Sequence, residues 1–108
     1  MAAEFYVSFR DTGWLPRHAE GLSAQIRMLP TFSKTDGSEY WLQGFEDRAA
    51  NGRWTYDVRI FLQDSNQILL ELSSRPPSIQ ADLLRFLSWL RSRTEVSVTD
   101  EDGEPIGW

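Results

Sequence analysis

Residues 77–93 constrain the fold most, because their apolar side chains recur at helical spacing. One side of this segment is apolar and carries Ile79, Leu83, Phe86, Leu87 and Leu90. The opposite side is polar and carries Gln80, Asp82, Arg85, Ser88 and Arg91. Pro76 and Pro77 are typical of a first helical turn, where a missing N–H costs no hydrogen bond. We therefore expect an amphipathic helix that covers an apolar sheet.

The remaining segments predict a sheet and a second helix. Alternating polar and apolar residues predict strands, whose ranges are 4–10, 39–46, 53–63, 67–73 and 94–99. Residues 15–28 predict a helix with Leu22, Ile26 and Leu29 directed inward, and residues 31–38 predict a loop with a turn at Asp36-Gly37. The order βαβββαβ indicates one α+β domain spanning residues 1–108. We expect a single, mostly antiparallel sheet with two helices packed on one face.

Two features of this sheet stay open at the level of sequence. The first and last strands are each joined to a neighbour through a helix, so one or both could pair in parallel. The strand 53–63 has an apolar stripe that includes Trp54, Tyr56, Val58, Ile60 and Leu62. We expect this stripe to face the helix 77–93, which would bury Trp54 and Tyr56. The other face could carry Tyr6, Arg10, Trp41, Gln43, Arg53, Thr55 and Asp57. Of the tryptophans, Trp41 is the better candidate for exposure.

Composition excludes several classes of function. The chain has no cysteine, which excludes disulfides, thiol catalysis and thiolate metal sites and favours the cytoplasm. No apolar run approaches the roughly 20 residues that span a bilayer, so we expect no membrane association. The net charge of −5 and the single lysine, Lys34, oppose binding to phosphate backbones. We therefore expect no nucleic-acid partner.

No pattern of residues indicates catalysis, a cofactor or a metal. His18 is the only histidine, and no spacing places it in a triad or a ligand set. Glu46-Asp47 could be a paired carboxylate, but acids are common where a strand ends. The run Asp100-Glu101-Asp102-Gly103-Glu104 lacks the alternating ligands and distant glutamate of an EF-hand, and the chain has no glycine-rich phosphate loop. We expect a protein that is not an enzyme.

Negative charge is concentrated in the second half of the chain. Residues 1–54 carry 6 basic and 7 acidic side chains, whereas residues 55–108 carry 5 basic and 9 acidic ones. Asp100, Glu101, Asp102 and Glu104 follow the last strand closely. If Ile106 and Trp108 pack against the body, these carboxylates would form a preformed negative surface. Such a surface suits a basic partner, although it could equally serve solubility alone.

The strand that runs into an acidic turn over residues 96–108, in a small cysteine-free and aromatic-rich chain, resembles bacterial immunity proteins. These include the cloacin and colicin type and those of contact-dependent inhibition and other polymorphic toxin systems. The resemblance implies a protein that binds one cognate toxin, often a basic nuclease, and masks its active site. The chain departs from the most acidic of them, because −5 is modest and ten arginines are many. Binding at an exosite, or a toxin that is not a nuclease, is therefore open.

These observations predict a partner-binding surface. We expect Asp100, Glu101, Asp102 and Glu104 to make electrostatic contacts and Trp41, Trp54 and Tyr56 to be the candidate aromatic anchors. A self-associating module, including a homodimer, is an alternative. A small-molecule-binding domain is another, and it would need a deep apolar pocket between helix and sheet.

Overall fold

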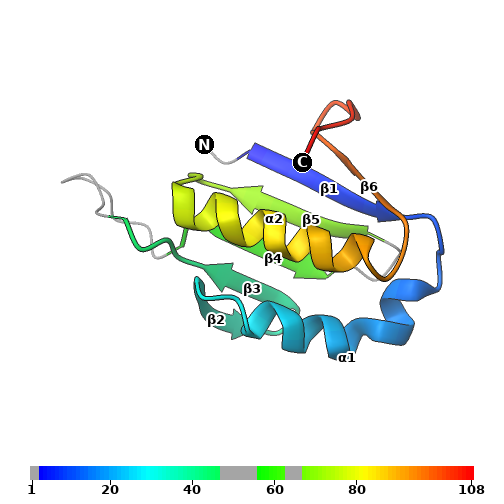
Figure 1. Cartoon of the computed structure of the whole chain (residues 1–108), viewed down its shortest axis with the longest axis horizontal. Coiled ribbons are helices and arrows are strands. Elements are labelled where there is room, and N and C mark those ends of the chain that lie inside the picture. The colour runs from blue at the N-terminus through cyan, green and yellow to red at the C-terminus, as the bar shows by residue number, and fades with distance from the viewer. Residues whose placement is uncertain (1–2, 47–55, 63–66) are drawn as a thin grey trace.

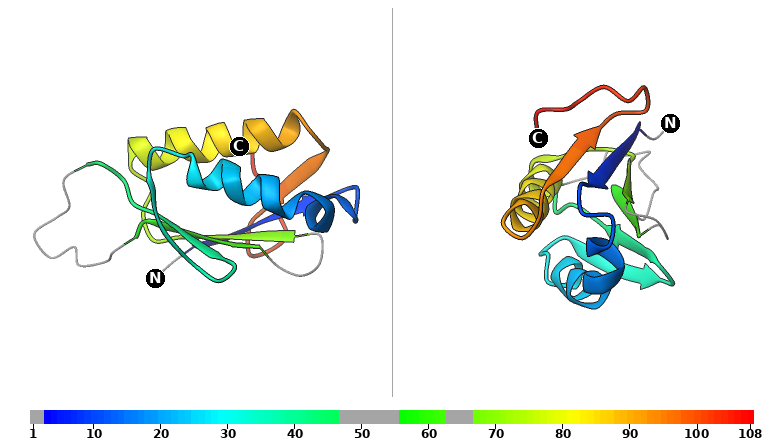
Figure 2. Two further views of the ribbon diagram at one scale, coloured as in Figure 1. Left: turned by 90° about the horizontal axis from the view of Figure 1, so that it is seen from below. Right: turned by 90° about the vertical axis from the view of Figure 1, so that its right-hand side faces the viewer.

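The computed structural model describes residues 3–46, 56–62 and 67–108, which form a six-stranded sheet with two helices over one face (Figures 1 and 2). The elements in chain order are β1 (Ala3–Phe9), α1 (Trp14–Arg27), β2 (Phe32–Asp36), β3 (Glu39–Leu42), β4 (Val58–Leu62), β5 (Gln67–Leu72), α2 (Pro77–Arg91) and β6 (Val96–Thr99). The predicted α+β class and the packing of both helices on one face are confirmed.

Every described strand pair in the sheet is antiparallel. The spatial order is β2-β3-β4-β5-β1-β6, so β1 lies between β5 and β6 and runs opposite to both. Parallel pairing of the first or last strand, which the sequence left open, is therefore wrong. The reason is that direction alternates across the sheet. Each helix connects two strands that run the same way, but other strands lie between them.

The segment 31–38, predicted as a loop, contains β2 instead, and the order becomes βαββββαβ. This strand lies at the sheet edge, with Ser33, Lys34 and Asp36 exposed and an irregular register between Phe32 and Lys34. The segment has few apolar residues, and the bulge interrupts their alternation with polar ones. The sequence pattern therefore does not predict β2. The predicted Asp36-Gly37 turn is confirmed, since Gly37 has a φ of 65° between β2 and β3.

The core lies between the sheet and the helices. The apolar face of α2 is buried as predicted, and Leu22, Ile26 and Leu29 are buried from α1 and the segment after it. The sheet contributes Val7, Phe9, Tyr40, Leu42, Val58, Ile60, Ile68, Leu70, Leu72 and Val98. The alternation of residues in β1, β4 and β5 thus places one side of each strand against the helices. In the part of the chain that is described, no helix has the length and apolarity to cross a membrane.

Two acidic residues that the sequence placed on polar faces are buried instead. Asp82 is only 2% exposed and accepts hydrogen bonds from Thr31 N and Oγ1, at 2.9 and 2.6 Å. Asp57 is also 2% exposed and accepts hydrogen bonds from Gly44 N at 2.7 Å and from Ser74 Oγ at 2.5 Å. Both carboxylates therefore connect segments that are distant in the sequence, a role that helical or strand periodicity does not predict.

Candidate protein-binding surface

The face of the sheet away from the helices, here called the outer face, carries a continuous row of polar and aromatic side chains. Cross-strand pairing aligns one residue from each of five neighbouring strands, in the order Lys34, Trp41, Arg59, Glu71 and Glu4. Residues paired in this way point to the same side of the sheet. The row changes from cationic at the β2 edge to acidic at β1.

Aromatic rings and cations pack against one another in the cationic half of this row. The Lys34 Nζ lies 4.1 Å from the centre of the Trp41 ring, and the rings of Trp41 and Tyr56 are 5.0 Å apart. The Arg59 guanidinium lies 4.7 Å from the Tyr56 ring and 5.3 Å from that of Phe61. These cation–π contacts hold flexible side chains in defined positions.

Arg59 is held further by two carboxylates. Its Nε donates to Glu71 Oε1 at 2.9 Å, its Nη2 donates to the same oxygen, and its Nη1 donates to Glu39 Oε1 at 3.2 Å. Glu39 also accepts a hydrogen bond from Trp41 Nε1 at 2.6 Å. Partial burial disfavours the charge of Arg59, but the hydrogen bond and the charge of Glu71 raise its pKa above the ordinary value. The guanidinium therefore stays charged in a fixed position on the outer face.

The acidic end of the chain is a closed turn beside β1 and β6. Asp100 Oδ1 accepts hydrogen bonds from the backbone N–H groups of Asp102 and Glu104, each at 2.9 Å. Gly103 has a φ of 81°, which suits glycine at this corner of the turn. Beyond the turn, Pro105 bridges to Thr99, and Ile106 N donates to Val98 O at 3.0 Å. The chain end thus folds back along β6 and covers part of that sheet edge.

Apolar contacts anchor the chain end to the body of the protein. Ile106 and Trp108 are partly buried and pack against the core, and the Trp108 ring lies 4.7 Å from that of Phe5. The Arg75 guanidinium also lies over the Trp108 ring, 5.1 Å from its centre. The packing of Ile106 and Trp108 that the sequence suggested is confirmed, and it fixes where the acidic turn lies.

Glu101 connects the acidic turn to the outer face. Its Oε1 accepts a hydrogen bond from Glu4 N at 2.9 Å, and the carboxylate of Glu4 accepts one from Tyr6 Oη at 3.1 Å. This hydrogen bond, together with burial and the charges of Glu4 and Glu101, raises the pKa of Tyr6 above its ordinary value. The acidic half of the row therefore extends from Glu71 through Glu4 to Glu101.

The structure unites part of the predicted surface. Trp41 and Tyr56 lie together on the outer face, and three strand spacings, about 14 Å, separate the strand of Trp41 from that of Glu4. Tyr56 is not in the core as expected, because it lies before β4 begins, and the alternation of that strand does not extend to it. Trp54 lies outside the described residues, as do Arg53 and Thr55.

The four predicted acidic residues differ in their surroundings. Asp100 uses one oxygen to close the turn, and Glu101 bonds to β1. Asp102 and Glu104 are exposed on the turn. Arg10 and Gln43, predicted for the outer face, are exposed just beyond β1 and β3, and Arg10 forms an ion pair with Glu95.

Sequence reasoning did not single out Arg59, Glu39, Glu71 or Phe61 as parts of the surface. Each alternates with the buried residues of its strand in the structure, and this alternation is a pattern that the sequence also shows. What joins them is the register between strands, and a one-residue difference in register would separate them. Within the described ranges, no group of acidic or histidine side chains is arranged to hold a metal ion.

The chain matches no protein-family model, no curated protein and no solved structure.

Proposed function

We propose that this protein is a non-enzymatic immunity protein that neutralises a cognate bacterial toxin domain by direct contact through its outer face. The observation that carries this proposal is the row from Lys34 to Glu4, extended by Glu101. It combines aromatic anchors, a fixed arginine and an acidic flank on one side of the sheet.

The composition of the outer face suits a protein partner. Tryptophan, tyrosine and arginine are the residues that most often dominate binding energy at interfaces. Here Tyr56 contacts both Trp41 and Arg59, and the Arg59 side chain is only 27% exposed. Less side-chain freedom is then lost on binding, which favours affinity.

The acidic flank indicates that the partner has a basic surface. Glu71, Glu4 and Glu101 adjoin one another, and Asp102 and Glu104 are exposed on the neighbouring turn. Carboxylates of this kind speed association with a basic surface and oppose association with an acidic one. Together with the resemblance to immunity proteins, this supports a basic toxin domain, bound in the bacterial cytoplasm without a cofactor.

The proposal is tested by purifying the tagged chain from its native host at two salt concentrations. We expect one stoichiometric toxin, encoded beside the gene of this protein, and slower capture at high salt. Co-expression with that toxin should then restore growth of the host. The variants Trp41→Ala and Glu101→Lys should restore it poorly.

Two control variants make the same changes on the helical side of the protein. Trp89→Ala removes a half-buried tryptophan of α2, and Glu20→Lys reverses an exposed charge on α1. Both should protect the host as the wild type does. If the chain is recovered alone, as a homodimer at both salt concentrations, the result would contradict neutralisation of a toxin and would favour a self-associating protein.

A further inference from the structure

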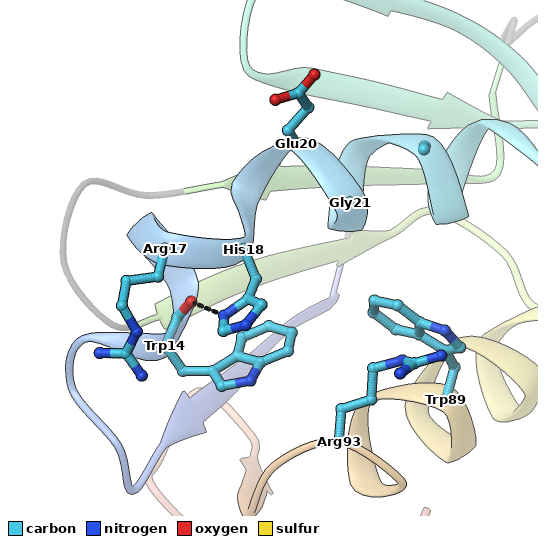
Figure 3. A pocket seen from close by; sticks show the side chains of 8 residues that line it. Trp14, Arg17, His18, Glu20, Gly21, Trp89 and Arg93 are labelled. Carbon is cyan, nitrogen blue, oxygen red and sulfur yellow. Dashed lines mark hydrogen bonds between the residues drawn. The ribbon is translucent and has the colours of Figure 1, made fainter.

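A groove of about 590 Å³ lies between α1 and α2, on the opposite side of the protein from the outer face (Figure 3). Its walls are mostly apolar and come from α1, α2 and the residues just after α2. This volume falls in the range of roughly 300–1,000 Å³ that is usual for small-molecule sites. The partner surface proposed above does not use it.

Aromatic rings form the base of the groove. The Trp14 and Trp89 rings are 6.3 Å apart at 72°, and the His18 ring stacks on Trp14 at 4.4 Å. Trp14 is 5% exposed and rests on Phe9, with 5.3 Å between the ring centres. His18 Nδ1 lies 2.9 Å from the Trp14 carbonyl oxygen, which can only accept, so Nδ1 carries a hydrogen. The base is therefore a fixed aromatic surface.

Gly21 lines the groove without a side chain that would narrow it. It lies in the middle of α1, where glycine is the least favourable residue after proline. A Cβ at this position would meet no other atom within 4 Å, so packing within the chain does not require glycine here. Its lack of a side chain leaves open the space between the two helices.

The rim of the groove carries two arginines, Arg17 and Arg93, although the protein as a whole is acidic. The Arg93 guanidinium lies 4.9 Å from the Trp89 ring centre, and among the described residues no carboxylate forms an ion pair with it. Arg17 forms an ion pair with Asp11 at 2.6 Å. Glu20, the acidic residue of the lining, points away from the two tryptophans in Figure 3. Arg93 is therefore the rim group that can pair with a negatively charged ligand.

We propose that the groove between α1 and α2 binds a small planar aromatic carboxylate. The ring of the ligand lies against Trp89 and His18 and contacts only the small exposed part of Trp14, and ring–ring contact adds to the burial of apolar surface. The carboxylate pairs with Arg93, whose planar guanidinium suits two parallel hydrogen bonds.

The test is a titration of the full chain with indole-3-acetate and with its uncharged analogue indole-3-acetamide, followed by ¹H–¹⁵N NMR. We expect saturable shifts of the indole N–H signals of Trp14 and Trp89, with Trp41 unchanged. The acetate should bind about tenfold more tightly than the amide, because a charged hydrogen bond is lost with the amide. Equal binding of the two, no saturable shift, or shifts centred on Trp41 would overturn the proposal.

Two variants separate the contributions of charge and space. Arg93→Gln should weaken binding of the acetate about tenfold and leave binding of the amide unchanged. Gly21→Leu should abolish binding of both probes, because the leucine side chain occupies the groove. Retained binding by Gly21→Leu would contradict the assigned position. Protection against the toxin should be unaffected in both variants, so failure of this site and failure of the proposed function are distinguishable.

Discussion

Arg59 shows how one side chain organises the outer face. It contacts two carboxylates and two aromatic rings, and each contact reaches a different part of the sheet or the segment beside it. Lysine has the same charge but lacks the planar fork that reaches Glu39 and Glu71 together. The arrangement therefore depends on arginine itself and not only on a positive charge.

Replacing Arg59 should destabilise the protein. We expect Arg59→Ala to lower the free energy of unfolding by about 1–2 kcal/mol, because Glu39 and Glu71 lose their partner and the rings lose a contact. Arg59→Lys should cost less. Urea unfolding of the full chain measures both. Arg10→Ala is the control, because the Arg10–Glu95 pair is 79% and 69% exposed and such pairs contribute about 0–1 kcal/mol. An Arg59→Ala variant as stable as this control would contradict the role assigned to Arg59.

Asp82 is the second residue whose replacement should lower the free energy of unfolding. Asp82→Ala leaves the buried N–H and Oγ1 of Thr31 without their acceptor, and it removes the ion pair with Arg85 Nη1 at 2.7 Å. We expect a loss of about 2–3 kcal/mol in the free energy of unfolding. Ser88→Ala, at an exposed position of the same helix, should change it by less than about 0.5 kcal/mol. Similar stability of the two variants would show that the Thr31–Asp82 contact contributes little.

The start of α2 depends on a residue from another part of the chain. Pro76 cannot cap the helix with its side chain, and Glu46 instead accepts hydrogen bonds from Ser78 N at 2.9 Å and from Ser78 Oγ at 2.5 Å. The hydrogen bond from the Ser78 side chain, with those from backbone N–H groups, lowers the pKa of Glu46 below its ordinary 4.5. A negative charge at this end also interacts favourably with the helix dipole.

The lowered pKa of Glu46 sets a pH dependence of stability. Because the pKa is lower in the folded state, the contribution of Glu46 is fully present above pH 4.5 and is lost as the pH falls through the folded-state pKa. Glu46→Gln should therefore be less stable than the wild type at neutral pH, and the difference should shrink below pH 4.5. Thermal unfolding over a pH series measures this. A difference that is constant with pH would contradict the capping role.

Replacement of Gly21 by alanine should stabilise α1. We expect Gly21→Ala to raise the free energy of unfolding by about 0.5–1 kcal/mol, because alanine favours the helix and its Cβ meets open space. Ala24→Gly, at another exposed position of the same helix, should lower it by a similar amount. Urea unfolding checks both. Destabilisation by Gly21→Ala would mean that the helix requires glycine for its own packing.

Elements with many buried residues were predictable from the sequence, whereas the edge strand β2 was not. The period of Ile79, Leu83, Phe86, Leu87 and Leu90 identified α2 and its buried face, because helical spacing follows directly from burial of one side. β2 escaped prediction because an edge strand buries little and its bulge interrupts the alternation. Strand direction also depended on the order of the whole sheet, which local patterns do not specify.

The outer face was predictable only in part. Trp41 lies on a strand whose alternation separates it from Tyr40 and Leu42, so its place on the outer face, where it is half-buried, followed from the sequence. The alternation wrongly predicted that Tyr56 is buried in the core. Asp57, just before β4, is buried in its place and hydrogen-bonded to Gly44 and Ser74. The pairing of Arg59 with Glu71 depends on the register between β4 and β5, which the sequence does not state.

The molecule as a whole presents two different surfaces on opposite sides. The outer face joins an aromatic cluster to an acidic flank, whereas the groove between the helices combines tryptophans with arginines. The whole sheet and its core lie between them (Figure 2). Substitutions on one surface should therefore leave binding at the other unchanged, as expected for separated sites without shared contacts.

The central claim, that a toxin domain binds to the outer face, is tested most directly by the binding kinetics of the purified chain with the partner that it captures, at low and high salt. We expect Trp41→Ala to raise the dissociation rate at least about tenfold. Glu101→Lys should slow association, and high salt should reduce this effect. The matched variants Trp89→Ala and Glu20→Lys should bind as the wild type does. Unchanged kinetics for Trp41→Ala and Glu101→Lys, with binding lost in the two helical variants, would contradict the outer face as the neutralising surface.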